Sequence, residues 1–234
     1  MPPSKIILVL LALVLGGGQS VAQSHAADSA EVEQHFQQLS RFFQQEKVLL
    51  ETEMRLYRAG TTAPVQTHQN SFCKQGERVR MKQLNQETII SPELVVQVDH
   101  NYREITLQTP QQVDQKQEPL GEMAFDLSLF SSFTLTKNDQ QTLIRLKCPP
   151  AVLYDFIDVA LHPETGLPQQ VTYWSKLDPN GLRSRMEVEY LRLEAAPDFP
   201  ANTFAAQQFV RKVAEGYQTA PAYHNYTLTD PLTD

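Results

Sequence analysis

The clearest pattern along the chain is an alternation of apolar and polar side chains between residues 154 and 193. Three alternating runs cover 154–161, 167–174 and 183–193, and the turns between them contain Pro, Asn or Gly. Successive side chains of a β-strand point to opposite faces of the sheet, and these turn residues are the ones that hairpins favour. The segment therefore predicts an antiparallel meander of three strands.

The same period recurs in the first two thirds of the chain. It predicts strands over 47–58, 67–73, 78–84, 94–98, 103–108, 133–136 and 142–147. Each strand has one apolar and one polar face, so we expect a mainly β fold in which sequence neighbours pair antiparallel. A sheet of this many strands tends to curl, and its own side chains, helices or a ligand must then fill its concave side.

The residues predicted to line that concave side are apolar and alternate with polar neighbours. In an ordinary protein they would simply form a packed core, and in a binding protein they would form a hydrophobic wall, where flexible Met side chains suit a ligand such as an acyl chain. The predicted set is Leu50, Met54, Leu56, Met81, Val96, Val98, Leu107, Ile144, Ile157, Val159, Met186 and Val188.

Two other segments have a helical period. Residues 29–45 place apolar side chains on one stripe, and the stretch after Pro119 does the same as far as residue 130. Both stripes are expected to pack against the sheet. Beyond Pro200 the pattern fits a short helix or an edge strand equally well, and the tail from about residue 215 is assigned to no element.

The first 22 residues have the layout of a secretory signal peptide. Lys5 precedes an apolar run over 6–15, three glycines follow, and small residues end the segment at Ala22. The run is too short to span a bilayer, although an uncleaved anchor is the alternative interpretation. Cleavage near Ala22 would leave a single domain over 23–234, exported and not integral to a membrane.

Charge narrows the range of partners. The whole chain has a net charge of −7, and loss of Lys5 with the leader makes it about −8. A negative chain is a poor partner for nucleic acid or for an anionic membrane surface.

Two cysteines remain in the mature chain, Cys73 and Cys148. In an oxidising compartment they could form a disulfide, which would stabilise the fold by about 4–5 kcal/mol in the chain-entropy model. Two separate half-buried thiols are the alternative, and the sequence leaves both possibilities open.

The sequence offers no catalytic arrangement. Its six histidines are scattered without metal-ligand spacing, and there is no glycine-rich phosphate loop or nucleophile elbow. Asp155 and Asp158 are close in sequence, but alternation places them on opposite faces of one strand, which suits a glycosidase pair badly. We therefore predict a protein without catalysis, cofactor or metal.

Two further motifs carry a resemblance. Residues 90–99 read Ile-Ser-Pro-Glu-Leu-Val-Val-Gln-Val-Asp, and residues 162–168 read His-Pro-Glu-Thr-Gly-Leu-Pro. Together with a helix, an alternating strand and a basic strand at the start of the mature chain, this order resembles the periplasmic outer-membrane lipoprotein carriers (LolA-like) and their RseB-type regulatory relatives. The resemblance implies a curved antiparallel half-open β-barrel that shelters acyl chains, with a helical lid formed by Phe36, Phe43, Met123, Leu127 and Phe130.

The chain departs from the family at three turns or strands. Gln75 stands where the carriers have a basic residue, Pro92-Glu93 replaces an Asp-Gly turn, and Met81 replaces an aromatic residue. The resemblance implies a periplasmic protein that binds a lipid or the acyl group of a lipoprotein. The alternative function is an envelope sensor or interaction module that uses the same fold to bind a protein partner.

Overall fold

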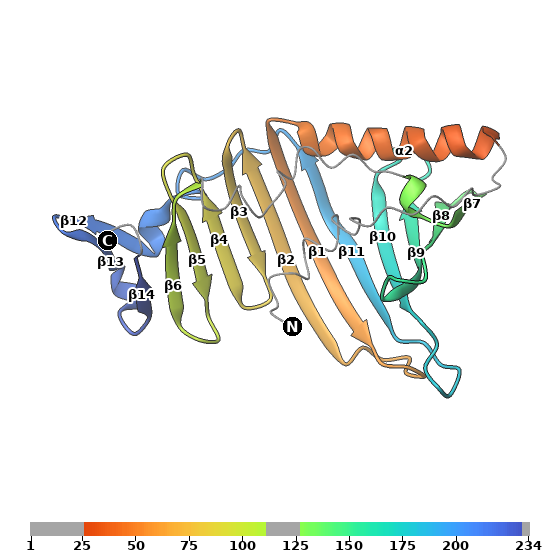
Figure 1. Cartoon of the computed structure of the whole chain (residues 1–234). Helices are drawn as coiled ribbons and strands as arrows, with labels where there is room; N and C mark the ends of the chain where they lie inside the picture. The colour runs from red at the N-terminus through yellow and green to blue at the C-terminus, as the bar shows by residue number, and fades with distance from the viewer. Residues whose placement is uncertain (1–25, 111–126, 231–234) are drawn as a thin grey trace. The chain divides into compact units, whose positions relative to one another are not determined.

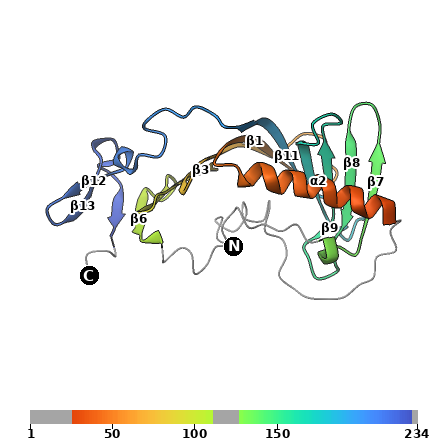
Figure 2. The same cartoon turned by 90° about the horizontal axis from the view of Figure 1, so that it is seen from above.

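The computed structural model describes residues 26–110 and 127–230 (Figures 1 and 2). Within them the chain is mainly β, as predicted, with one long helix. Its elements, in order, are α2 (Ala26–Gln44), β1 (Lys47–Tyr57), β2 (Gln66–Gln75), β3 (Arg78–Gln83), β4 (Gln86–Ile90), β5 (Val95–Asp99), β6 (Glu104–Gln108), η1 (Leu127–Leu129), β7 (Ser132–Lys137), β8 (Thr142–Lys147), β9 (Tyr154–Leu161), β10 (Pro168–Ser175), β11 (Arg185–Ala195), η2 (Ala206–Gln208), β12 (Val210–Val213), β13 (Gly216–Thr219), η3 (Pro221–Tyr223) and β14 (Thr227–Thr229).

Twelve of these strands form one hydrogen-bonded sheet. Its order is β14-β6-β5-β4-β3-β2-β1-β11-β10-β9-β8-β7, and β12 pairs with β13 in a separate hairpin. The chain divides into two compact units. The described part of the first comprises 26–44, 52–68 and 127–191, and that of the second comprises 45–51, 69–110 and 192–230. Strands β1, β2 and β11 contribute residues to both units.

In the first unit, β7 to β11 pair antiparallel in the order of the sequence. Residues directly opposite each other on antiparallel strands lie on the same face of the sheet. Two rows of apolar residues therefore share one face, namely Leu135, Ile144, Val159, Val171 and Val188, and Phe133, Leu146, Ile157, Tyr173 and Met186.

In the second unit, β2 to β6 also pair antiparallel. Their apolar face is covered by the chain's own C-terminal segment. Ile89, Val96 and Leu107 form a buried cluster with Phe209 and Val210. Strand β14 extends this sheet by pairing parallel to β6.

The prediction that only sequence neighbours pair antiparallel is wrong at two places. Strand β1 lies beside β11, and β14 is parallel to β6. Strand β4 was not predicted at all. The second predicted helix lies largely in 111–126, outside the described residues, and only the short 3-10 helix η1 follows there. Closure of the sheet into a half-open barrel remains a prediction, as does the signal peptide over 1–22.

Candidate functional site: the apolar face beneath helix α2

The candidate site is the apolar face of β7 to β11, in the first unit. Most of its side chains are buried, and Ile144, Val188 and Leu161 are fully inaccessible to solvent. The face ends at Lys137, on the edge strand β7, and at Thr142 of β8, which pairs with both Lys137 and Leu161. The face therefore offers a largely apolar surface, with the charged Lys137 at its margin.

Helix α2 lies along this face. Its apolar residues Val32 and Phe36 are buried, and Lys137 on the same face of β7 forms an ion pair with Glu31 of the helix. Gln38 donates a hydrogen bond of 2.6 Å to the carbonyl of Thr165, in the turn between β9 and β10. Figure 2 shows the helix crossing the strands on one side of the sheet.

The helix is incompletely buried toward its C-terminal end. Leu39, Phe42 and Phe43 are only half-buried, although they continue the apolar stripe of Val32 and Phe36. Phe42 and Phe43 contact each other edge to face, with ring centroids 5.4 Å apart. The second half of the helix thus keeps apolar surface in contact with water.

The ring of His35, on the helix itself, makes no hydrogen bond within the part of the chain that the structure describes. Both of its nitrogens are buried, and a carboxylate oxygen of Glu31 lies 3.7 Å from Nε2, beyond hydrogen-bond distance. An unsatisfied buried polar group costs about 1–3 kcal/mol. This position therefore weakens the attachment of α2 to the sheet.

Five of the predicted wall residues lie on this face, and two more lie on the same side of the adjoining strand β1. Ile144, Ile157, Val159, Met186 and Val188 are placed there by the strand register. On β1, Tyr57 and Arg55 contact residues on the other face, so alternation places Met54 and Leu56 on the apolar side. Met54 is buried, and Leu56 is half-buried. Leu50 is also half-buried, but it lies in the part of β1 that belongs to the second unit.

The remaining predicted wall residues are elsewhere. Val96, Val98 and Leu107 belong to the second unit, where they pack against Phe209 and Val210. Met81 pairs with Phe72 and Thr88, and it lies on the opposite face from Val96, Val98 and Leu107. On the face of Val96 and Val98 the register places Arg80 of β3, which forms an ion pair with the buried carboxylate of Glu87.

The structure describes four of the five residues that were predicted to form a lid. Phe36 and Phe130 are buried, and Phe43 and Leu127 are half-buried. Met123 lies outside the described residues. Sequence reasoning missed further residues of the apolar face, and the alternation within their strands was the signal that could have found them: Phe133, Leu135, Leu146, Leu161, Val171 and Tyr173.

Both cysteines are free thiols in this structure, so the disulfide that the sequence left open is absent from it. Cys148 is buried beside the apolar face, and burial raises the pKa of its thiol to about 11. Cys73, on β2, is half-buried, and burial raises its pKa as well. Burial also raises the pKa of Tyr173 and brings that of Tyr190 to about 12.

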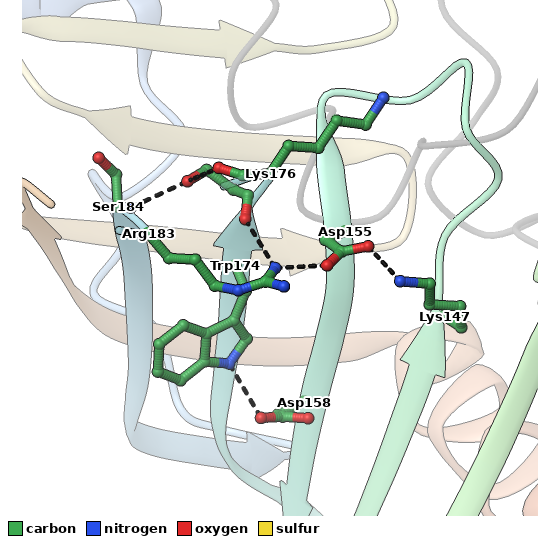
Figure 3. Close-up of polar contacts among 8 residues, drawn as sticks. Lys147, Asp155, Asp158, Trp174, Lys176, Arg183 and Ser184 are labelled. Atoms are coloured by element: carbon green, nitrogen blue, oxygen red, sulfur yellow. Dashed lines mark hydrogen bonds and ion pairs between the residues drawn. The ribbon is translucent and has the colours of Figure 1, made fainter. Parts of the chain in front are cut away.

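The opposite face of the same strands is polar and aromatic (Figure 3). Both Asp155 and Asp158 contact residues of this face, so the prediction that alternation separates them onto opposite faces is wrong. The register between β9 and β10 shifts beside Asp155, between the pairs Phe156–Trp174 and Tyr154–Ser175, and this shift breaks the alternation. Asp155 accepts hydrogen bonds from Lys147 and Arg183, which lower its pKa. Asp158 accepts two hydrogen bonds from Arg145, at 2.6 and 2.8 Å, and one of 2.9 Å from the indole of Trp174.

Guanidinium groups also lie over aromatic rings on this face. Arg145 and Arg183 stand 4.4 and 4.9 Å from the ring centroid of Phe156, and Arg185 stands 3.7 Å from that of Tyr57. We call the residues Tyr57, Arg145, Phe156, Trp174, Arg183 and Arg185 the arginine–aromatic face. The first unit thus has two chemically distinct faces, one apolar and one charged.

No family model matches the chain, and no curated protein matches it. Solved structures do. A chain of the Pseudomonas aeruginosa MucA/MucB complex is 12% identical with a TM-score of 0.44, over 81% of this chain and 63% of that one. A conserved protein from Thermus thermophilus is 7% identical with a TM-score of 0.46, over 86% and 99% of the two chains.

A LolA superfamily protein from Nitrosomonas europaea is 10% identical with a TM-score of 0.32, over 76% of this chain and 98% of that one. The family that the sequence resembles is therefore represented among the structural matches. This chain spans less than two thirds of the matched MucA/MucB chain. Among the described residues, no helix is long and apolar enough to cross a membrane, and no three His, Cys, Asp or Glu side chains gather to hold a metal ion.

Proposed function

We propose that this chain is a periplasmic carrier that shelters a lipid, or the acyl group of a lipoprotein, without catalysis. The observation that carries the proposal is the apolar face of β7 to β11 with the amphipathic helix α2 along it. In the ligand-free form α2 covers the face. On binding, an acyl chain replaces some of the apolar side chains of α2 in contact with the face.

Weak attachment of the helix supports its role as a lid. The Glu31–Lys137 ion pair is exposed, and exposed ion pairs contribute about 0–1 kcal/mol. The hydrogen bond from Gln38 is exposed as well. The buried ring of His35, which makes no hydrogen bond within the described residues, could bond to water if the helix lifted, and this lowers the cost of lifting it. Lifting the helix therefore costs less than its apolar contacts alone suggest.

Binding energy is available without any reactive group. Removal of each methylene from water contributes about 0.8 kcal/mol, so about ten methylenes supply roughly 8 kcal/mol. That gain must exceed the cost of parting Val32 and Phe36 from the sheet, which is of order 1.5–3 kcal/mol for each buried side chain. An acyl chain of ordinary length meets this requirement.

The test is saturable binding of a fluorescent fatty-acyl probe to the purified protein. Leu135→Asn places an amide on the apolar face at the edge strand β7, where Leu135 is half-buried. The variant should lose about 1–2 kcal/mol of apolar contact, which lowers the affinity for the probe about five- to thirtyfold. Thr136→Asn changes the next residue, on the other face of the same strand, and should leave the affinity unchanged.

Native mass spectrometry without detergent provides an independent measurement. An added mass identified as lipid supports the carrier. A clean apo mass that lipid does not change, together with equal probe binding by the two β7 variants, contradicts it. The single tryptophan, Trp174, lies on the polar face, and its emission serves as a folding control.

The arginine–aromatic face favours a second function, an envelope sensor or interaction module that binds a protein partner. Trp, Tyr and Arg are the residues enriched in the energetically dominant parts of protein interfaces. Trp174→Ala and Arg185→Ala would then abolish capture of the partner and leave acyl-probe binding intact. The carrier predicts the opposite pattern for Leu135→Asn.

A further inference from the structure

The first unit ends in three loops that expose aliphatic side chains to solvent. These are 58–65, between β1 and β2; 149–153, before β9; and 176–184, between β10 and β11. Val65 is 47% exposed, Leu153 69%, Leu177 56% and Leu182 46%. We propose that these three loops, here called the leucine tip, dock on the surface of a phospholipid bilayer.

The loops lie side by side and form one surface. A Cβ placed on Gly60 would stand 3.2 Å from Cδ1 of Leu182, so the first and third loops are in contact. Arg185 also reaches the carbonyl of Thr61, at 3.5 Å. Lys176 donates a hydrogen bond to the carbonyl of Pro150 and thereby links the second loop to the third. The β1–β2 and β10–β11 loops are seen together at the lower end of their strands in Figure 1.

The third loop is held in a fixed conformation. The side chain of Asp178 accepts hydrogen bonds from the backbone N–H groups of Asn180 and Leu182, at 2.9 and 2.8 Å. The N–H of Asp178 in turn donates to the carbonyl of Leu182 at 2.8 Å, which closes the turn. Insertion of Leu177 and Leu182 into a bilayer would therefore cost little conformational entropy, because the loop that carries them is already ordered.

The charges around the tip complement anionic headgroups. Arg58, Lys147, Lys176 and Arg183 surround it, against Asp155 and Asp178. Asp155 pairs with Lys147 and Arg183 and so offsets part of their charge, and Asp178 accepts hydrogen bonds from the backbone. Four cations against two carboxylates still leave the surroundings of the tip positive in a chain whose net charge is −7, and a local excess of cations attracts anionic lipid at short range.

The composition of the tip favours a bilayer over a protein partner. Its exposed apolar residues are aliphatic, with prolines between them, whereas aromatic and Arg anchors dominate protein interfaces. Leucine side chains on loops insert among acyl chains with a gain of about 0.8 kcal/mol for each buried methylene. Aliphatic residues ringed by cations fit the boundary between headgroups and acyl chains.

This inference does not depend on the carrier function, because the tip and the apolar face are separate surfaces. The test is flotation of the full chain with vesicles of phosphatidylethanolamine and phosphatidylglycerol, compared with vesicles of phosphatidylcholine alone. We expect the protein to float with the first and much less with the second. The triple variant Leu153→Ser, Leu177→Ser, Leu182→Ser should lower the partition coefficient at least about tenfold.

Leu191→Ser is the matched control. Leu191 is 52% exposed, but it lies six residues beyond Arg185 along β11, about 20 Å from the tip. Its replacement should leave flotation unchanged. Leu135→Asn should also leave flotation unchanged while it weakens the acyl probe, so failure of the carrier and failure of the tip are distinguishable.

A second measurement protects the test against a misfolded variant. The fluorescence of a tryptophan introduced by Leu177→Trp should be quenched by lipids that are brominated on their acyl chains. The fluorescence of one introduced by Tyr102→Trp, at an exposed turn of the second unit, should not be quenched. Three outcomes would overturn the proposal: no flotation of the unaltered protein with either vesicle, unchanged flotation of the triple variant, or equal quenching at positions 177 and 102.

Discussion

At the residue scale, the two thiols are the groups whose chemistry the fold changes most directly. Burial and the nearby Asp155 carboxylate raise the pKa of Cys148 to about 11, and burial also raises that of Cys73. The thiolate is the reactive species, so both groups are almost entirely protonated and unreactive at neutral pH. In the folded protein we expect slow alkylation of both, slower at Cys148 because it is the more buried.

Mass spectrometry after iodoacetamide treatment measures this, with and without denaturant and with no reductant present. Unfolding should allow both Cys73 and Cys148 to be alkylated, which adds two modifications. A denatured chain that takes up none until reductant is added would show that the two residues form a disulfide. Rapid alkylation of Cys148 in the folded chain would contradict its burial.

Residue-level prediction from sequence failed where charge enters the core. Alternation identified the apolar and polar faces of β3 correctly, but it assigned Met81 to the side of Val96 and Val98. The register places Arg80 there instead, in contact with the nearly inaccessible carboxylate of Glu87 and with the carbonyl of Thr203. A pattern of apolar and polar residues cannot reveal that a charged pair is buried, because the partner of Arg80 depends on a tertiary contact.

At the scale of elements, the turn between β9 and β10 determines how α2 attaches. Gly166 has a φ of +64°, and a Cβ there would stand 2.7 Å from Oε1 of Gln38, closer than real contacts allow. Gly166→Ala should therefore cost about 1 kcal/mol in backbone strain and also displace Gln38 from Thr165. Gly76→Ala is the matched control, since Gly76 has a φ of +58° and no atom within 4 Å of such a Cβ.

Urea unfolding and amide hydrogen exchange separate the two effects. Both variants should lose similar stability from strain, but only Gly166→Ala should accelerate exchange within α2, because only that glycine contacts the helix. The same variant should admit the acyl probe faster if the helix is a lid. Equal exchange of α2 in the two variants would show that the Gln38 contact does not hold the helix.

Elements with a regular period were predictable, and those defined by distant partners were not. The meander of β9, β10 and β11 was predicted within about two residues at most ends, and α2 was predicted from its stripe. Strand β4 was missed because residues 86–88 show no alternation of apolar and polar side chains. Glu87 is buried and stands where an apolar residue is expected. Strand β14 has three residues and pairs with β6 more than a hundred positions earlier, so no local signal could specify it.

At the scale of the whole molecule, the C-terminal segment decides which part of the sheet is available to a ligand. It fills the apolar face of β4 to β6 with Phe209 and Val210, so Val96, Val98 and Leu107 belong to a closed core. The sequence could not predict this, because Phe209 fits a helix or a strand equally well and its partners lie far away in the chain. The proposed acyl site is accordingly limited to the first unit.

This division predicts separate responses to core mutations in the two units. Phe209 is 2% exposed, and Phe209→Ala leaves a cavity that should cost about 3–5 kcal/mol. We expect amide exchange to accelerate in β4 to β6 and to stay slow in β8 to β10, because local opening exposes only the unit that has lost its packing. Ile144→Ala, in the first unit, should give the reverse pattern. Faster exchange of both sets of strands in both variants would mean that β1, β2 and β11 join the two units into one cooperative structure, and acyl-probe binding should then fall in Phe209→Ala as well.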